Sequence, residues 1–162
     1  MSDWFSQGVN PEWIHAIIGT VAKVPEHVFL VLTKRPEHLW WGWFGGEEVK
    51  LPPNLWFGVS VTNQKDVWRI HELVKRLPHQ HKFVSFEPLH EHIDADLKGI
   101  EWVIIGAETG NRKGRIAPEA EWVNHLIGQA DERGIPVYLK DNLASSLFPA
   151  FDLRQEFPEA MQ

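Results

Sequence analysis

Residues 27–34, HVFLVLTK, form a continuous apolar run that contains the β-branched side chains of Val28, Val31 and Thr33. Such a run predicts a strand that is buried on both faces, as strands of parallel sheets usually are. Four further runs of this kind follow along the chain. We expect strands at residues 55–61, 82–86, 102–105 and 137–139.

Helical patterns separate these runs. Asn10 followed by Pro11 predicts a helix start, because Asn is a good cap and Pro needs no hydrogen-bond acceptor at the first position. The apolar residues of this first helix recur at helical spacing: Trp13, Ile14, Ile17, Ile18 and Val21. Further helices are expected at residues 36–44, 63–77 and 119–133, the last ended by Gly134, with a short one from Leu143.

The alternation of buried strands and amphipathic helices predicts parallel βα units in a single α/β domain over residues 1–162, with an irregular tail after about residue 149. Five strands are too few to close an eight-stranded barrel. We therefore expect a partial (β/α) barrel, similar to a TIM barrel. Two explanations stay open: a second chain covers the sheet edge, or the chain is the C-terminal part of a longer barrel, which we favour.

Composition excludes several functions. The net charge of −6 offers no global attraction to nucleic acid. The chain contains no cysteine, so it has no disulfide, no cysteine nucleophile and no thiolate ligand for an iron–sulfur cluster. Its longest apolar runs are too short for a membrane span, and no charged-then-apolar leader opens the sequence, which predicts a cytoplasmic location.

Small and polar residues recur on one side of each predicted strand and continue past its end. Because ligands bind at the carboxyl ends of parallel strands, this set predicts a ligand site, although polar strand ends that simply meet solvent are the alternative. Thr33 and Arg35 are assigned to the same side on the first strand. The candidate ligand-binding residues are Arg35, Ser60, Ser85, Glu87, Gly106, Glu108 and Lys140.

Within this set, Glu87 and Glu108 can form a carboxylate pair that holds a metal or shares a proton, or each can be neutralised by Lys140 or Arg35. We expect Glu87, Glu108 and Lys140 to share one cavity. No catalytic residue follows from the sequence.

Weaker candidates are a basic loop and a group of histidines. The loop at residues 111–115, NRKGR, could hold phosphates, but a solvated loop is favoured. His79, His81, His90 and His92 match no compact zinc pattern, and we expect no metal site. Nothing resembles a nucleophile elbow, a P-loop or a dinucleotide fingerprint, which argues against serine hydrolases and Rossmann dehydrogenases.

Six motifs occur in a characteristic order: MSDWF (1–5), LTKRP (32–36), WFGVSV (56–61), FVSFEPL (83–89), WVIIGAETG (102–110) and Lys140-Asp141. In this order, from Met1 to about Leu143, the chain resembles the phage gene-product thirty-seven/sixty-eight family. That family is similar to radical S-adenosylmethionine enzymes such as spore photoproduct lyase. The resemblance implies a phage or prophage protein, a radical-SAM-like barrel, and S-adenosylmethionine as a candidate ligand. It implies that Ser60, Ser85, Glu87 and Gly106 contact the ligand, with Glu108 and Lys140 as its polar anchors.

The chain departs from the family pattern at one point. Family members carry an N-terminal cysteine cluster that resembles a [4Fe–4S] site, and this sequence has no cysteine. The resemblance therefore implies a cluster-less C-terminal part of a barrel, from a truncated reading frame, a split gene or a degraded prophage gene, that is inactive alone.

The alternative is a non-enzymatic interaction module that oligomerises through its open sheet edge and the tryptophan-rich segment 39–44. The expected partner is a second copy or an N-terminal segment carrying the missing strands, with nucleic acid only weakly supported.

Overall fold

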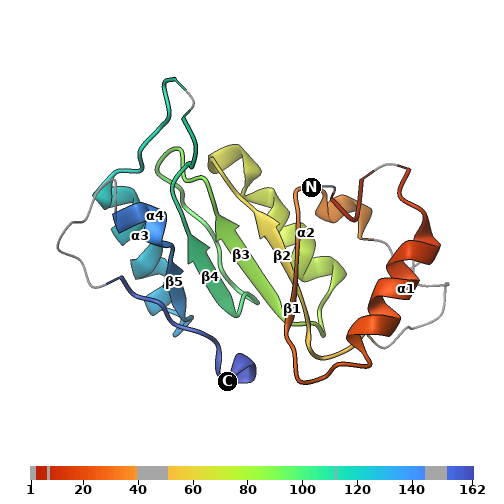
Figure 1. Ribbon diagram of the computed structural model, residues 1–162. Helices are drawn as coiled ribbons and strands as arrows, with labels where there is room; N and C mark the ends of the chain where they lie inside the picture. Colours follow the sequence, from red (N-terminus) through yellow and green to blue (C-terminus); the bar gives the residue numbers. More distant parts are fainter. Residues whose placement is uncertain (1–2, 7, 40–50, 112, 145–152) are drawn as a thin grey trace.

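A computed structural model describes residues 3–6, 8–39, 51–111, 113–144 and 153–162. Its centre is a five-stranded sheet in which every neighbouring pair is parallel and the spatial order follows the chain (Figure 1). The strands are β1 (Phe29–Thr33), β2 (Leu55–Ser60), β3 (Lys82–Phe86), β4 (Trp102–Ile105) and β5 (Val137–Leu139). The predicted α/β class is confirmed, and β3, β4 and β5 have the predicted bounds.

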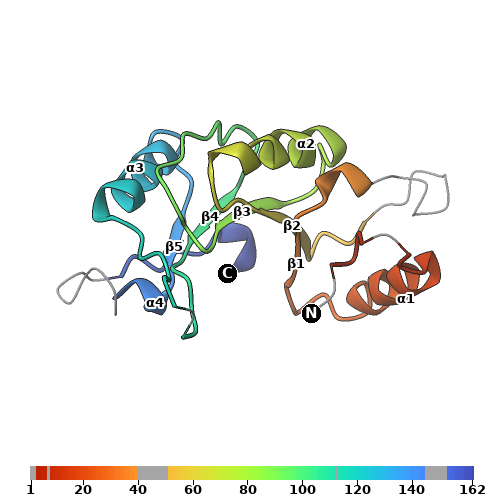
Figure 2. The ribbon, with the colours of Figure 1, turned by 90° about the horizontal axis from the view of Figure 1, so that it is seen from above.

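The helices are α1 (Pro11–Val21), α2 (Trp68–Arg76), α3 (Ala120–Asp131) and α4 (Asp141–Ala144), with 3-10 turns η1 (Pro36–His38), η3 (Gln64–Asp66) and η4 (Glu159–Met161). Seen from above, α2 and α3 cover one face of the curved sheet, while the C-terminal segment lies against the other face (Figure 2). We call these the outer and the inner face. The helix α1 lies beyond β1, at the end of the sheet (Figure 2).

The predicted capping of α1 is confirmed, because the Asn10 side chain accepts a hydrogen bond from the Glu12 amide at 2.9 Å. Its predicted apolar stripe is too wide. Ile14, Ile18 and Val21 are buried, but Trp13 is 64% exposed and Ile17 37% exposed. The reason is the position of α1 beside the sheet, where only a narrow stripe contacts the core.

The hydrophobic core lies between the sheet and the outer helices. Outward-facing strand residues pair across the sheet in register, as Phe57 does with Val31 and Val59 with Val84. Several of them are fully buried, including Leu55, Val59, Val84, Phe86, Val103, Ile105 and Val137. Successive residues on each strand alternate between this core and the inner face.

The inner face begins with an aromatic cluster at the amino ends of the strands, formed by Trp56, Phe83 and Trp102. The C-terminal segment, residues 153–162, covers this cluster. Its backbone pairs with β5 through Leu139 N and Arg154 O at 2.8 Å, and Trp102 Nε1 donates to Glu156 O at 2.9 Å. The described part of the predicted irregular tail is therefore attached to β5 and packed on the sheet.

The facing predicted for β1 is wrong. Leu32 pairs with Gly58 and Thr33 pairs with Val59, so Thr33 points to the outer core and is 2% exposed. Its hydroxyl donates to the Asp3 carboxylate at 2.8 Å, which satisfies the polar group there. Leu30 and Leu32 occupy the inner face instead and are 47% and 44% exposed, so β1 is not buried on both faces as predicted.

The helix predicted over residues 36–44 is described only at its start, where η1 forms, and the tryptophans at 40, 41 and 43 lie outside the described residues. Within the part of the chain that the structure describes, none of the helices combines the length and apolar character that crossing a bilayer requires.

Candidate functional site

The inner face contains a cavity of about 300 Å³ above the aromatic cluster, toward the carboxyl ends of the strands. Its wall is mostly aliphatic and aromatic, and two charged side chains stand in it. The lining residues are Leu30, Leu32, Phe83, Ser85, Glu87, Trp102, Ile104, Tyr138, Lys140 and Phe157. This volume lies at the lower end of the range of small-molecule sites.

The two charged side chains form an ion pair. Lys140 Nζ lies 2.7 Å from Glu87 Oε1 and 2.9 Å from Oε2. Their side chains are 42% and 25% exposed, so water reaches the pair and its net contribution to stability is small. Each side chain of such a pair can exchange its partner for a charged ligand group at little cost in free energy.

Gly106 makes room for this pair. A Cβ atom at position 106 would lie 3.0 Å from Glu87 Cδ and 3.0 Å from Lys140 Cδ. The backbone of Gly106 is held by hydrogen bonds to Phe86 O at 3.1 Å and from Leu89 N at 3.0 Å. The predicted role of Gly106 at the site is thus a steric one, because the absent side chain lets the two head groups meet over the strand.

Ser60 and Ser85 pair in register on the inner face and are 4% and 3% exposed. Ser85 lines the cavity. The Ser60 carbonyl accepts a hydrogen bond from Arg69 Nη1 at 2.8 Å, which ties the end of β2 to α2.

Glu108 takes a different position from the one predicted. It is not among the described residues that line the cavity, and its Oε2 lies 3.6 Å from His90 Nε2. β4 ends at Ile105, three residues earlier, and the Ala107 amide and carbonyl are both bonded by the Asn142 side chain, at 3.0 and 2.9 Å. Strand alternation ends there, so it no longer predicts the direction of Glu108.

Arg35 is exposed and occupies the position just before η1, two residues beyond β1, without a side-chain capping hydrogen bond. The inner-face positions of β1 belong to Leu30 and Leu32, so the facing used to group Arg35 with the site is wrong.

Sequence reasoning missed Asn142, which lies in α4 directly after Lys140 and Asp141. Its Nδ2 atom is 3.5 Å from Glu87 Oε1 and 2.9 Å from Ala107 O, so it joins the ion pair to the turn after β4. The sequence signal that could have identified Asn142 is an amide side chain two residues after Lys140, the charged residue that follows β5.

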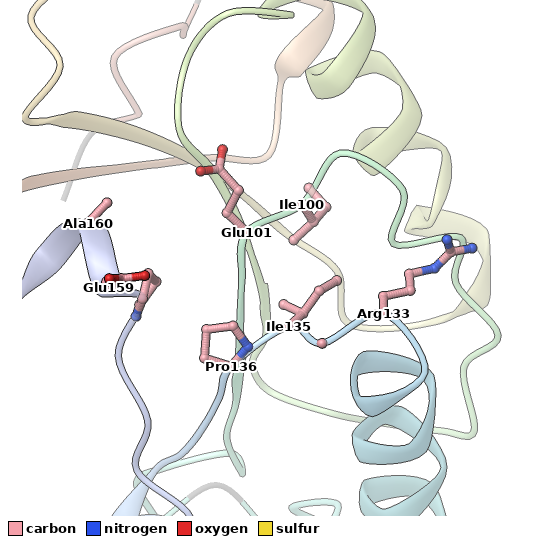
Figure 3. Close-up of a pocket in the computed structure, with 9 residues that line it drawn as sticks. Ile100, Glu101, Arg133, Ile135, Pro136, Glu159 and Ala160 are labelled. Atoms are coloured by element: carbon pink, nitrogen blue, oxygen red, sulfur yellow. The ribbon is translucent and has the colours of Figure 1, made fainter.

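A second, wider cavity of about 580 Å³ lies at the opposite, amino ends of the strands (Figure 3). Three charged side chains line it, and two of them, Glu101 and Arg133, lie on different sides of it (Figure 3). The Glu101 carboxylate binds His81 Nδ1 at 2.6 Å, and Arg133 Nη2 binds Asp96 at 2.8 Å. Both groups are directed to partners outside the cavity, so the carboxyl-end cavity is the better candidate for a ligand site.

The electrostatics of the amino-end region centre on Lys82, which is 4% exposed. Burial lowers the pKa of Lys82 below its ordinary value, and the nearby Glu101 carboxylate opposes this shift. The Lys82 ammonium donates to the Gln80 carbonyl. Burial of the charged Lys82 therefore costs folding free energy, and Lys82 does not line the candidate site.

The weaker candidates from the sequence are dispersed. In the basic loop, the described residues Asn111, Lys113 and Arg115 are exposed, and position 112 lies outside the described residues. Of the four neighbouring histidines, His81 contacts Glu101, His90 contacts Glu108, and His92 lies against His125 with ring centroids 4.2 Å apart. The four do not converge on one point.

These observations define an α/β protein with an all-parallel sheet and a candidate ligand site at the carboxyl ends of its strands. The chain belongs to the family described as "Protein of unknown function (DUF5131)", whose model matches residues 1–144. The matched range contains all five strands, and the C-terminal segment on the inner face follows it. No curated protein and no solved structure matches the chain.

Proposed function

We propose that this domain is the ligand-facing part of a radical-SAM-like barrel and binds S-adenosylmethionine, or a related nucleoside ligand, in the carboxyl-end cavity. The observation that carries the proposal is the Glu87–Lys140 pair, which meets over Gly106 in a cavity whose other walls are mostly aliphatic and aromatic. The parallel sheet and the ordered motifs of the sequence support it as well.

The chemistry of the pair suits the amino-acid end of this ligand. An ammonium group can bind Glu87 and a carboxylate can bind Lys140, so the ligand replaces one internal ion pair by two charge-assisted contacts. The apolar wall at Ile104 and Tyr138 can take the less polar remainder.

An iron–sulfur cluster does not fit the residues of this chain. Such clusters are held by cysteine thiolates, and the sequence contains no cysteine. We therefore propose ligand binding, and no radical step, for this chain alone.

Titration calorimetry with S-adenosylmethionine and S-adenosylhomocysteine tests the proposal. We expect one site per chain, and affinity at least tenfold lower in Glu87→Gln and Lys140→Met because each variant removes one charged contact. The matched controls are the exposed Glu132→Gln and Lys98→Met, which change net charge equally. Absence of saturable binding by the wild-type protein at millimolar ligand would refute the proposal.

A second candidate function, an interaction module, is favoured by one observation. The edge strand β1 exposes Leu30 and Leu32 side by side on the inner face, at 47% and 44%. Exposed apolar side chains on an edge strand are typical of surfaces that pair with another chain. Sedimentation velocity at micromolar concentration should show a dimer or higher oligomer that dissociates in Leu32→Glu and persists in Ile116→Glu, a change at a similarly exposed site outside the sheet. A monomer throughout that range would argue against this function.

A further inference from the structure

Two histidines and an aspartate meet on the surface between α3 and the connection from β3 to β4. His92 and Asp94 flank Ile93, which is fully buried, and both are exposed. His125 lies on α3, one turn before Gln129, on a side of the helix distinct from its buried residues Val123, Leu126 and Ala130. The fold thus brings together residues that are more than thirty positions apart.

The distances suit a common ligand-binding point. His125 Nε2 lies 2.6 Å from Asp94 Oδ1, and the rings of His92 and His125 have centroids 4.2 Å apart. One nitrogen or oxygen ligand atom from each of the three residues lies within 4.8 Å of the other two. A tetrahedral zinc ion with bonds of about 2.0–2.1 Å places its ligand atoms about 3.4 Å apart. An ion would replace the Gln129 amide, whose Nε2 lies 3.0 Å from His125 Nε2 and 3.3 Å from Asp94 Oδ1.

The backbone around Asp94 is held in place from two sides. The Gln64 side chain accepts from Asp94 N at 2.8 Å and donates to Asp94 O at 3.0 Å. Gln129 Oε1 accepts from Ala95 N at 3.2 Å, so α3 binds the next peptide as well. Because this segment is already ordered, an ion would not have to organise a free loop, which favours binding.

We propose that His92, Asp94 and His125 bind one divalent transition-metal ion, Zn²⁺ in the first place, and so tie the β3–β4 connection to α3. Imidazole nitrogen is a preferred ligand for zinc, copper and nickel, and a carboxylate completes a three-residue set that leaves a fourth position for water. The His125–Asp94 contact and the packing of the His92 ring on His125 explain the two pairs, and the proposal rests on the convergence of one ligand atom from each of the three residues. The site uses none of the residues of the carboxyl-end cavity, so it is independent of the proposed function.

The test is calorimetric titration of the tag-free, metal-stripped protein with Zn²⁺ alone, together with the visible absorption spectrum of bound Co²⁺. We expect one equivalent of Zn²⁺, with affinity lowered at least tenfold in His92→Asn, Asp94→Asn and His125→Asn. His79→Asn is the matched control, because it removes one exposed histidine outside the cluster.

Circular dichroism of each metal-free variant establishes that the fold is retained, and the chain has no thiolate that could bind the ion elsewhere. The proposal is overturned if the wild type binds no stoichiometric Zn²⁺ at millimolar concentration. It is overturned equally if His92→Asn lowers the affinity for Zn²⁺ no more than His79→Asn does, because His92 would then not be a ligand.

Discussion

Lys140 and Glu87 come from strand ends that are not neighbours, since β4 lies between β3 and β5, yet their head groups meet at 2.7 Å. They meet above β4, at the position where Gly106 has no side chain. The contact depends on three strand ends in register and on one missing Cβ atom.

A series of glycine substitutions tests this steric role. A Cβ at Gly58 would lie 2.3 Å from the buried Phe83 ring, one at Gly106 would lie 3.0 Å from two flexible side chains, and one at Gly128 on α3 would have no neighbour within 4 Å. We expect Gly58→Ala to lower the unfolding free energy by about 3 kcal/mol and Gly106→Ala by about 1 kcal/mol. Gly128→Ala should raise it by up to about 1 kcal/mol, through helix propensity. Urea denaturation measures the three unfolding free energies, and a rise at position 106 like the one expected at position 128 would contradict the close contact.

The neighbouring residues Phe86, the last of β3, and Glu87, which follows it, should differ in their contribution to stability. Phe86 is fully buried in the outer core, so Phe86→Ala should cost about 3–5 kcal/mol of unfolding free energy. Glu87 follows on the inner face in a hydrated ion pair, so Glu87→Gln should cost no more than about 1 kcal/mol. Urea midpoints of the two variants check this. Equal losses would mean that the Glu87–Lys140 pair is a structural element of the core.

Residues 157–162 should protect Trp102 from solvent. Phe157 packs on Trp102 with ring centroids 5.6 Å apart, and Met161 packs on the same aromatic cluster. A chain that ends at Glu156 keeps the pairing of Arg154 and Glu156 with β5 but loses this cover. Acrylamide quenching of tryptophan fluorescence should therefore increase, and the increase should disappear when Trp102→Phe is combined with the truncation. An increase that persists in the combined variant would come from another tryptophan.

The buried Lys82 should make stability depend on pH in a defined direction. Burial lowers its pKa in the folded protein from the ordinary value of 10.5. Below the folded pKa the lysine is charged in both states, and the cost of burying that charge is fully present. Between the two pKa values the unfolded chain binds more protons, so the unfolding free energy rises with pH.

The measurement compares Lys82→Met with the wild type by urea denaturation from about pH 7 to about pH 10. The unfolding free energy of the wild type should rise relative to that of Lys82→Met as pH rises. Only the wild type has a buried lysine whose charge is removed at high pH. Lys98→Met, at an exposed lysine, controls for the change in net charge. A difference that does not vary with pH would show that the Lys82 ammonium is well solvated.

Much of the sheet was predictable because each strand is a short apolar run, and most of these runs are bounded by glycine, proline or charged residues. The bounds of β3, β4 and β5 follow from such runs. Alternation also placed Ser85 and Glu87 on the inner face, next to Lys140. These are local properties, and local pattern predicts them when one face of every strand must pack on helices.

The same reasoning was wrong at Thr33, because it assumed that a polar residue turns away from the core. Thr33 shares its side of β1 with the buried Val31, and Asp3, thirty residues earlier, accepts its hydrogen bond and so satisfies the hydroxyl in the core. Glu108 lies three residues beyond the end of β4, where Asn142 holds the backbone of Ala107 and strand alternation no longer applies. In both cases local alternation did not include a contact made by a residue distant in the sequence.

The sequence by itself determined the class of fold, the strand positions, the lack of any thiolate ligand, and the inner-face position of Glu87. The tertiary structure alone decided that Glu87 meets Lys140 over Gly106, that residues 153–162 cover the aromatic cluster, and that His92 and Asp94 meet His125. The physical reason is that periodicity reports which face a residue takes on its own element. Which groups meet depends on how elements pack, and this is set by contacts between segments many residues apart.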